Sequence, residues 1–219
     1  MGDTAQWTTR PEELPHGDLV RVMWEQHARI RSLCSDVMSA QKLVAKTIAF
    51  DELRGLLAVH EAAEQVVVRP RSRVAAGESL ANDRDAEEEA VAHALVRLEG
   101  LPIDGSEFDA RFVAFARSVV EHFEAEETTV FPRILIGYDV DERRRLGTQV
   151  IQAERRAPIY PHPRLVGSKA KQLMFGPFAA LLDLAKEALS AVHDAPSTAA
   201  SGVPLPSTGF VDQVQGTTR

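Results

Sequence analysis

The chain has 219 residues, 44% of them hydrophobic, so it can bury one core of ordinary domain size. Its formal net charge of −7 and the lack of a Lys/Arg-rich block exclude a nucleic-acid binder that relies on electrostatic attraction. A single cysteine, Cys34, excludes an internal disulfide, a zinc ribbon and an iron–sulfur site.

The sequence also carries no signal for a membrane span or for secretion. Nowhere do eighteen apolar residues follow one another. The first residues, "MGDTAQWTTRPEELPHGD", contain no basic segment followed by an apolar run. We therefore expect a cytoplasmic protein that binds neither a membrane nor a nucleic acid.

The first predicted helix follows an irregular lead-in, residues 1–17, that contains Pro11, Pro15 and Gly17. Asp18 is a suitable N-cap for this helix. Core-facing positions then recur in alternating steps of three and four residues. They are Val20, Met23, His27, Ile30, Cys34 and Val37. His27 thus stands where an apolar residue is expected, whereas Cys34 fits a small core residue.

The second predicted helix also has polar residues on its core-facing side. Its row is Phe50, Leu53, Leu57, His60, Glu64 and Val67, and Pro70 is expected to mark its end. After a loop with Gly77 and Asn82, a third helix is predicted before Gly100 and Pro102. Its core-facing row is Glu88, Val91, Leu95 and Leu98.

The fourth predicted helix begins after Gly105 and repeats the pattern of the second. Its row is Phe108, Phe112, Phe115, Val119, His122 and Glu126, followed by Pro132. Four amphipathic helices with short connections and no alternating strand pattern predict an all-α protein, an antiparallel up-down four-helix bundle over residues 18–136.

Residues 137–193 are predicted to form a helical extension that packs on the bundle. They comprise a charged helix in "DERRRLGTQVIQAERRAP", an extended stretch in "PIYPHPRL" and an amphipathic helix in "FGPFAALLDLAKEALSAV". The apolar residues of the last helix need burial, namely Phe175, Phe178, Leu181, Leu182, Leu184 and Leu189. Residues 194–219 lack periodicity and are expected to be disordered.

Three histidines fall at nearly one level of the predicted bundle. His27 lies nine residues after Asp18, while His60 and His122 each lie ten residues before a proline. Glu64 and Glu126 follow one turn later on the same faces. Because each unpaired charge or imidazole in a core costs several kcal/mol, this arrangement indicates a metal site. A His/carboxylate set without thiolate suits iron or manganese, and His-x-x-x-Glu on two helices suggests two ions.

The ligand from the third helix is left open by the sequence. Glu88 lies on the core-facing row, and His93, off that row, is the alternative. Glu61 and Glu127 directly follow His60 and Glu126, so either could assist or replace its neighbour, although a solvated or supporting role is the simpler interpretation.

With these residues identified, the chain resembles the hemerythrin-like proteins of the HHE cation-binding class over about residues 18–136. The resemblance lies in "EQHARIRSL", "LLAVHEAAEQVVVRP" and "VVEHFEAEETTVFPRIL". It implies a bundle holding two iron ions with an oxo or hydroxo bridge. Carried over, the glutamates of the two His-x-x-x-Glu pairs would bridge the irons and the three histidines at one level would be terminal ligands.

The third helix departs from the family pattern, which usually presents a histidine where this chain has Glu88. A carboxylate there would make the site more anionic and favour ferric iron, and hence redox chemistry over reversible oxygen carriage. The resemblance implies binding or sensing of dioxygen or a related small oxidant, such as peroxide or nitric oxide. The alternatives are an enzyme that detoxifies peroxide or nitric oxide, and a helical module with a structural metal.

Overall fold

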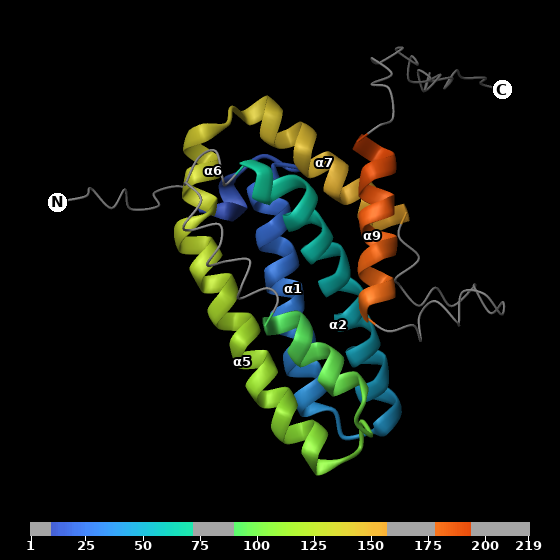
Figure 1. The fold of residues 1–219 in the computed structure, drawn as a ribbon. Helices are drawn as coiled ribbons and strands as arrows, with labels where there is room; N and C mark the ends of the chain where they lie inside the picture. The colour runs from blue at the N-terminus through green and yellow to red at the C-terminus, as the bar shows by residue number, and fades with distance from the viewer. Residues whose placement is uncertain (1–9, 72–89, 157–177, 194–219) are drawn as a thin grey trace, which may run out of the picture.

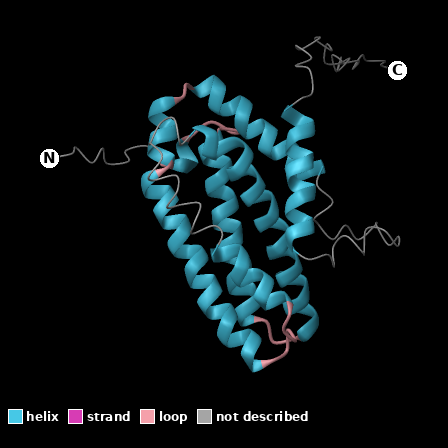
Figure 2. Ribbon diagram, viewed as in Figure 1, coloured by secondary structure: helices cyan, strands magenta, loops and turns pink. Residues whose placement is uncertain are grey.

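The computed structural model describes residues 10–71, 90–156 and 178–193, and the regular elements in these ranges are helices (Figures 1 and 2). The described part of the chain forms the predicted helical bundle, with two further helices packed against it. Residues 72–89, which include Glu88, lie outside the described residues, as do the "PIYPHPRL" stretch and the predicted tail. Among the described helices, none is long and apolar enough to cross a membrane.

Helix α1 (Leu19–Ser39) begins as predicted at Asp18, whose side chain accepts a hydrogen bond from the backbone N–H of Val20. This bond satisfies one of the free N–H groups of the first turn. A short connection at residues 40–42 leads into α2 (Leu43–Ala63), which packs along α1 (Figure 1). Helix α2 begins well before Phe50, where the predicted core-facing row starts. The sequence pattern missed these first turns because their apolar residues Leu43, Val44 and Ile48 are exposed and so do not follow the core-facing spacing.

The second helix does not end before Pro70. It continues through a π-helical segment, η2 (Glu64–Val68), and remains helical to Arg71. In η2 the backbone N–H of Arg69 donates to the carbonyl of Glu64, five residues earlier. Proline has no N–H to donate, and its ring clashes with the carbonyl four residues before it in a regular α-helix. The wider π-helical turn directly before Pro70 accommodates this ring, so the chain continues as a helix.

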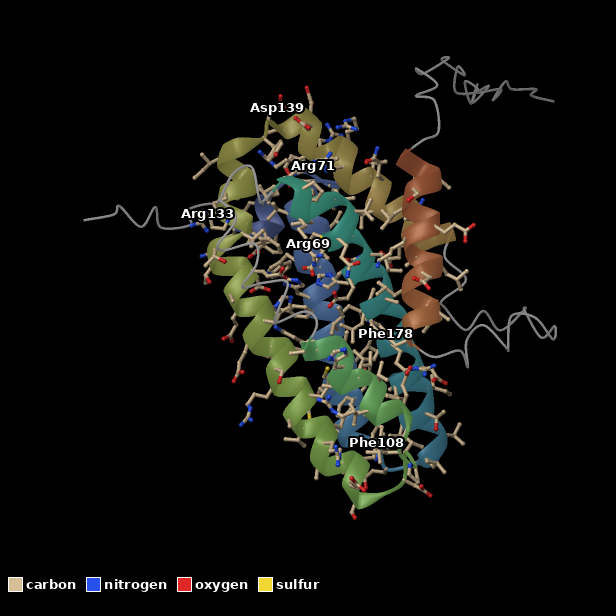
Figure 3. All side chains as sticks on the ribbon, in the orientation of Figure 1. Arg69, Arg71, Phe108, Arg133, Asp139 and Phe178 are labelled. Atoms are coloured by element: carbon tan, nitrogen blue, oxygen red, sulfur yellow. The ribbon has the colours of Figure 1, made fainter. Side chains whose placement is uncertain are left out.

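The other half of the bundle consists of a helix at residues 90–99 and the long helix α5 (Ser106–Thr129). Helix α5 begins directly after Gly105, as the sequence predicts. Val130 ends α5 and precedes α6 (Phe131–Gly137), with Pro132 in its first turn, where the missing proline N–H is not needed. Figure 3 shows Phe108 at the opposite end of the bundle from Arg71 and Asp139.

Two helices beyond the bundle cover its end and one side. Helix α7 (Val140–Arg156) contacts α1 and α9, and α9 (Phe178–His193) lies along α2 (Figure 1). Helix α9 buries Phe178, Leu181, Ala185 and Leu189, at helical spacing. Its first backbone N–H, that of Phe178, donates to the Glu99 carboxylate at 2.9 Å, which ties the start of α9 to the helix at residues 90–99. A negative charge also stabilises the N-terminal end of a helix.

Candidate metal centre

The core-facing polar residues that the sequence singled out lie inside the bundle, on three helices. His27 comes from α1, His60 from the end of α2, and Glu64 from the first position of η2. His122 and Glu126 come from the last turns of α5. All five side chains are buried, and the two least exposed residues, His27 and His60, have 0% of their surface accessible.

The ligating atoms of His27, His60, Glu64 and Glu126 all lie within 4.8 Å of one another. His27 Nε2 is 3.4 Å from Glu126 Oε2, and His60 Nε2 is 3.1 Å from Glu64 Oε1. His122 is outside this group of four, but its Nε2 lies 3.6 Å from Glu126 Oε2 and 3.9 Å from Glu64 Oε2. The three helices therefore bring imidazole and carboxylate groups to one point, as the spacing predicts.

Hydrogen bonds on the outer side of two imidazoles fix which nitrogen faces the cluster. His27 Nδ1 lies 2.8 Å from Glu127 Oε1, and the same oxygen accepts a hydrogen bond from Arg31. His60 Nδ1 lies 3.2 Å from Gln26 Oε1. Both partners are acceptor oxygens, so each Nδ1 carries the proton and each Nε2 turns its lone pair toward the cluster. This is the tautomer that a metal-binding histidine with a supporting acceptor uses.

Aromatic side chains close one side of the cluster. The ring of Phe123 stacks on the His27 imidazole with centroids 3.8 Å apart and planes 6° apart. Phe123 also meets His60 edge-on, and the Phe131 ring stacks on the His27 imidazole with centroids 5.3 Å apart. These contacts hold the imidazole planes in place and exclude water from this side of the cluster.

Burial sets the charge of the cluster. Burial lowers the pKa of His27 from 6.5 to about 3, so this imidazole is neutral at physiological pH. Burial by itself would raise the pKa of Glu64, but its interactions with the His60 and His122 side chains outweigh burial and hold that pKa well below its usual range. The cluster thus places an ionised carboxylate beside a neutral imidazole in a closed interior.

Several of these buried atoms have no hydrogen-bond partner among the described residues. They are Nε2 of His27, Nε2 of His60 and both carboxylate oxygens of Glu64. The His60 and Glu64 atoms face each other closely but without the alignment of a hydrogen bond. Lone pairs that converge without a proton between them fit a bound cation, which supplies the missing positive charge. Imidazole and carboxylate ligands without thiolate suit iron or manganese.

Comparison with known proteins identifies the family. Residues 18–134, more than half of the chain, match the model of the hemerythrin HHE cation binding domain. The chain belongs to this family. Neither the curated proteins nor the solved structures contain a match to it. The buried His/Glu cluster lies on helices within the matched hemerythrin HHE domain, so the protein is a cation-binding domain with a cluster that is compatible with a metal site.

The remaining site residues of the sequence analysis fall in different places. Glu88 lies outside the described residues of this hemerythrin-like domain and stays a prediction. His93 is exposed, on the helix whose Val91 and Leu95 are buried, and it does not join the cluster. Glu61 is buried rather than solvated, and burial, with the negative charge of Glu64, raises its pKa to about 8.

Glu127 supports His27 rather than replacing Glu126. Burial by itself would raise the pKa of Glu127, but the hydrogen bonds from His27 and Arg31 hold it below its usual range. Sequence reasoning missed Gln26, the corresponding partner of His60. A signal was present, because Gln26 stands four residues from Val22 and from Ile30 in a second buried row of α1.

A cavity of about 530 Å³ borders the cluster at His122. It lies between α5 and the helix at residues 90–99, and its lining includes Val91, Ala94, Phe115 and His122. His122 is thus the cluster residue that borders a space large enough for small molecules.

Proposed function

We propose that the protein is a non-heme iron protein with a dinuclear site that binds or senses dioxygen or a related small oxidant, such as peroxide or nitric oxide. The proposed protein ligands are His27, His60, Glu64, Glu88, His122 and Glu126. Membership of the hemerythrin HHE family supports a bound cation, and the choice of ligand atoms rests on the geometry of the cluster.

The observation that carries this proposal is the group of buried, converging lone pairs. Four ligand atoms from three helices lie within 4.8 Å of one another, and those of His27, His60 and Glu64 have no hydrogen-bond partner among the described residues. A buried polar network that serves only stability is normally satisfied by its own hydrogen bonds. Such a cluster is costly without a cation and stable with one.

The position of Glu64 supports two ions rather than one. Its Oε1 faces His60 Nε2 at 3.1 Å, and its Oε2 faces His122 Nε2 at 3.9 Å. Glu126 Oε2 is likewise shared between His27 and His122, at 3.4 and 3.6 Å. A carboxylate with a histidine at each oxygen, as in Glu64, could contact two ions, each with its own imidazole. For Glu126 the support is a single oxygen that lies between two histidines, and both placements support the proposed bridging roles.

Two irons, when bound by these residues, would supply redox chemistry toward a small oxidant. The chain's own residues set the conditions for that chemistry. Phe123 and Phe131 keep water from the face next to His27, whereas the cavity beside His122 admits small molecules. Glu127 and Gln26 hold the two imidazoles in the ligating tautomer. The site is therefore dry on one side and accessible on the other.

The test is the metal content and electronic spectrum of the full chain purified from iron-supplemented cells, before and after peroxide or dithionite. We expect about two irons per chain and an absorption band that bleaches on reduction, because the resemblance to the family implies a bridged pair of irons inside the bundle. His60→Ala and His122→Ala should lose both, whereas His93→Ala, a change at an exposed histidine, should retain both. One zinc ion, or no metal with an unchanged fold, would refute the proposal.

Loss of iron in Glu88→Gln, with the helical content unchanged, would support the predicted ligand from the segment before residue 90. Normal iron content in that variant would remove Glu88 from the ligand set and leave the other five residues. Since Glu88 lies outside the described residues, this variant tests the sequence pattern alone.

A further inference from the structure

Two consecutive hydrogen bonds connect the cluster to α7, a helix that lies beyond the matched family domain. The side-chain amide of Gln26, buried in α1, lies between His60 and Glu154. Its Oε1 is 3.2 Å from His60 Nδ1, and its Nε2 donates to Glu154 Oε2 at 3.1 Å. Glu154 belongs to α7, whereas the family match ends at residue 134.

We propose that Glu154 is a positioning residue of the metal centre, which sets the amide orientation of Gln26 and, through it, the tautomer of His60. The consequence for metal binding rests on the proposed function, whereas the tautomer itself does not. In this view α7 completes the metal centre of the bundle.

The reasoning starts from what each group can donate or accept. An amide has a donor end and an acceptor end of nearly the same shape, so Gln26 can present either end to His60. An ionised carboxylate only accepts, so Glu154 selects the NH₂ end of Gln26. The oxygen of Gln26 then faces His60, and Nδ1 of that imidazole must carry the proton. Nε2 of His60 is left with its lone pair toward Glu64, as a metal ligand requires.

Without the carboxylate, the opposite arrangement becomes available. If Gln26 turned its NH₂ end to His60, Nδ1 would have to accept, and the proton would move to Nε2. That nitrogen could then not bind a cation. A surface cavity of about 180 Å³, lined in part by Gln26, Ile151 and Glu154, adjoins the hydrogen bond. Water in this space can both donate and accept, so it would not select one end of the amide.

The two histidines differ in their need for such help. The partner of His27 is the carboxylate of Glu127, which accepts only and therefore fixes the His27 tautomer directly. The partner of His60 is an amide, which is ambiguous until a third group orients it. The proposal therefore predicts that loss of the Glu154 carboxylate changes the tautomer of His60 and leaves that of His27 unchanged.

Close packing holds α7 in the register that this contact needs. The guanidinium of Arg143 donates to Asp18 at 2.9 Å, at the start of α1, and also to the carbonyl of Tyr138 at 2.6 Å. Gly147 approaches the backbone of Gly17 so closely that a Cβ there would lie 2.2 Å from the Gly17 oxygen. With these points fixed, α7 runs along α1 and brings Glu154 to Gln26.

The experiment compares Glu154→Ala, Glu154→Gln and Glu142→Gln in the full chain. Glu142 is on the same helix, where it pairs with Arg145 on the surface, so it is the matched control. The first readout is the ¹⁵N spectrum of the histidine side chains after chelation of the metal. We expect His60 in the Nδ1–H form in the wild type and in the control, and a mixture of tautomers in Glu154→Ala. Glu154→Gln keeps an acceptor oxygen and should lie nearer the wild type.

The second readout is the affinity for ferrous iron, measured by competition with a chelator. Loss of a group that supports a metal-binding histidine costs 10–100-fold in affinity, and we expect about tenfold for Glu154→Ala because it acts through Gln26. If chelation unfolds the chain, the tautomers of the folded state cannot be recorded, and the affinity for ferrous iron is then the readout that tests the positioning role. Wild-type tautomer and affinity in Glu154→Ala would overturn the positioning role while leaving the iron site intact. A shifted tautomer in a chain that binds no iron would instead overturn the proposed function.

Discussion

Replacing Glu64 by methionine should have opposite effects on stability without and with metal. Glu64 is 2% exposed, and both carboxylate oxygens lack a hydrogen-bond partner among the described residues. The His27 imidazole, whose ligating atom lies within 4.8 Å of that of Glu64, is neutral at pH 8 because burial lowers its pKa to about 3, so it offers the carboxylate no positive charge. Methionine has a similar length and no charge. We therefore expect the free energy of unfolding of the metal-free protein to rise by up to about 4 kcal/mol, the largest gain found when a whole buried ion pair is replaced by apolar groups.

With metal present the order should reverse. Binding to the folded state alone adds about 2.7 kcal/mol at a free metal concentration 100 times the dissociation constant. The wild type has this gain, whereas Glu64→Met has lost a proposed ligand to both ions and should gain far less. A site selected for metal binding is thus expected to lower the stability of the metal-free chain, as functional sites commonly do.

The assay is denaturant unfolding followed by circular dichroism at pH 8, once with excess chelator and once with ferrous iron. The matched control is Glu124→Met, the same change at an exposed position of α5, which should alter stability by no more than about 0.5 kcal/mol. The reasoning fails if Glu64→Met destabilises the metal-free protein by about 1 kcal/mol or more in the assay with chelator. That result would mean that the protein itself satisfies the carboxylate and that no cation is needed.

Three further outcomes follow from the described contacts. Gly147→Ala should destabilise the protein by about 1–3 kcal/mol, because backbone atoms must move, whereas Gly100→Ala, with its nearest contact at 3.6 Å, should be tolerated in the same unfolding assay. Since burial raises the pKa of Cys34 to about 12, a thiol reagent at pH 8 should label the unfolded chain once and the native protein not at all. Because burial lowers the pKa of His27 from 6.5 to about 3, the unfolded chain takes up this proton first as the pH falls. The metal-free protein should therefore lose stability as the pH falls from about 6.5 to about 3. Over this range the urea midpoint of His27→Gln should fall less than that of the wild type. An equal fall in both proteins would contradict the conclusion that His27 is buried in its neutral form.

Much of the fold could be predicted from local patterns. The core-facing rows of α1 and α5 are buried almost throughout, and Asp18 and Gly105 start their helices as predicted. The second helix was harder to delimit, because its first turns lie outside the core and Pro70 is accommodated by a π-helical segment. Both deviations depend on what surrounds the helix, and a periodicity argument does not contain that information.

The sequence by itself determined which residues meet inside the bundle. A fixed helical period places His27, His60 and Glu64 on core-facing rows, and short connections bring those rows to one level. Only the tertiary structure decided how the imidazoles are oriented, because their partners come from other turns or other helices. Glu127 reaches His27 across 100 residues of sequence, and Glu154 reaches Gln26 across 128. Such contacts follow from the packing of whole helices, which in α7 depends on the close approach of Gly147 to Gly17.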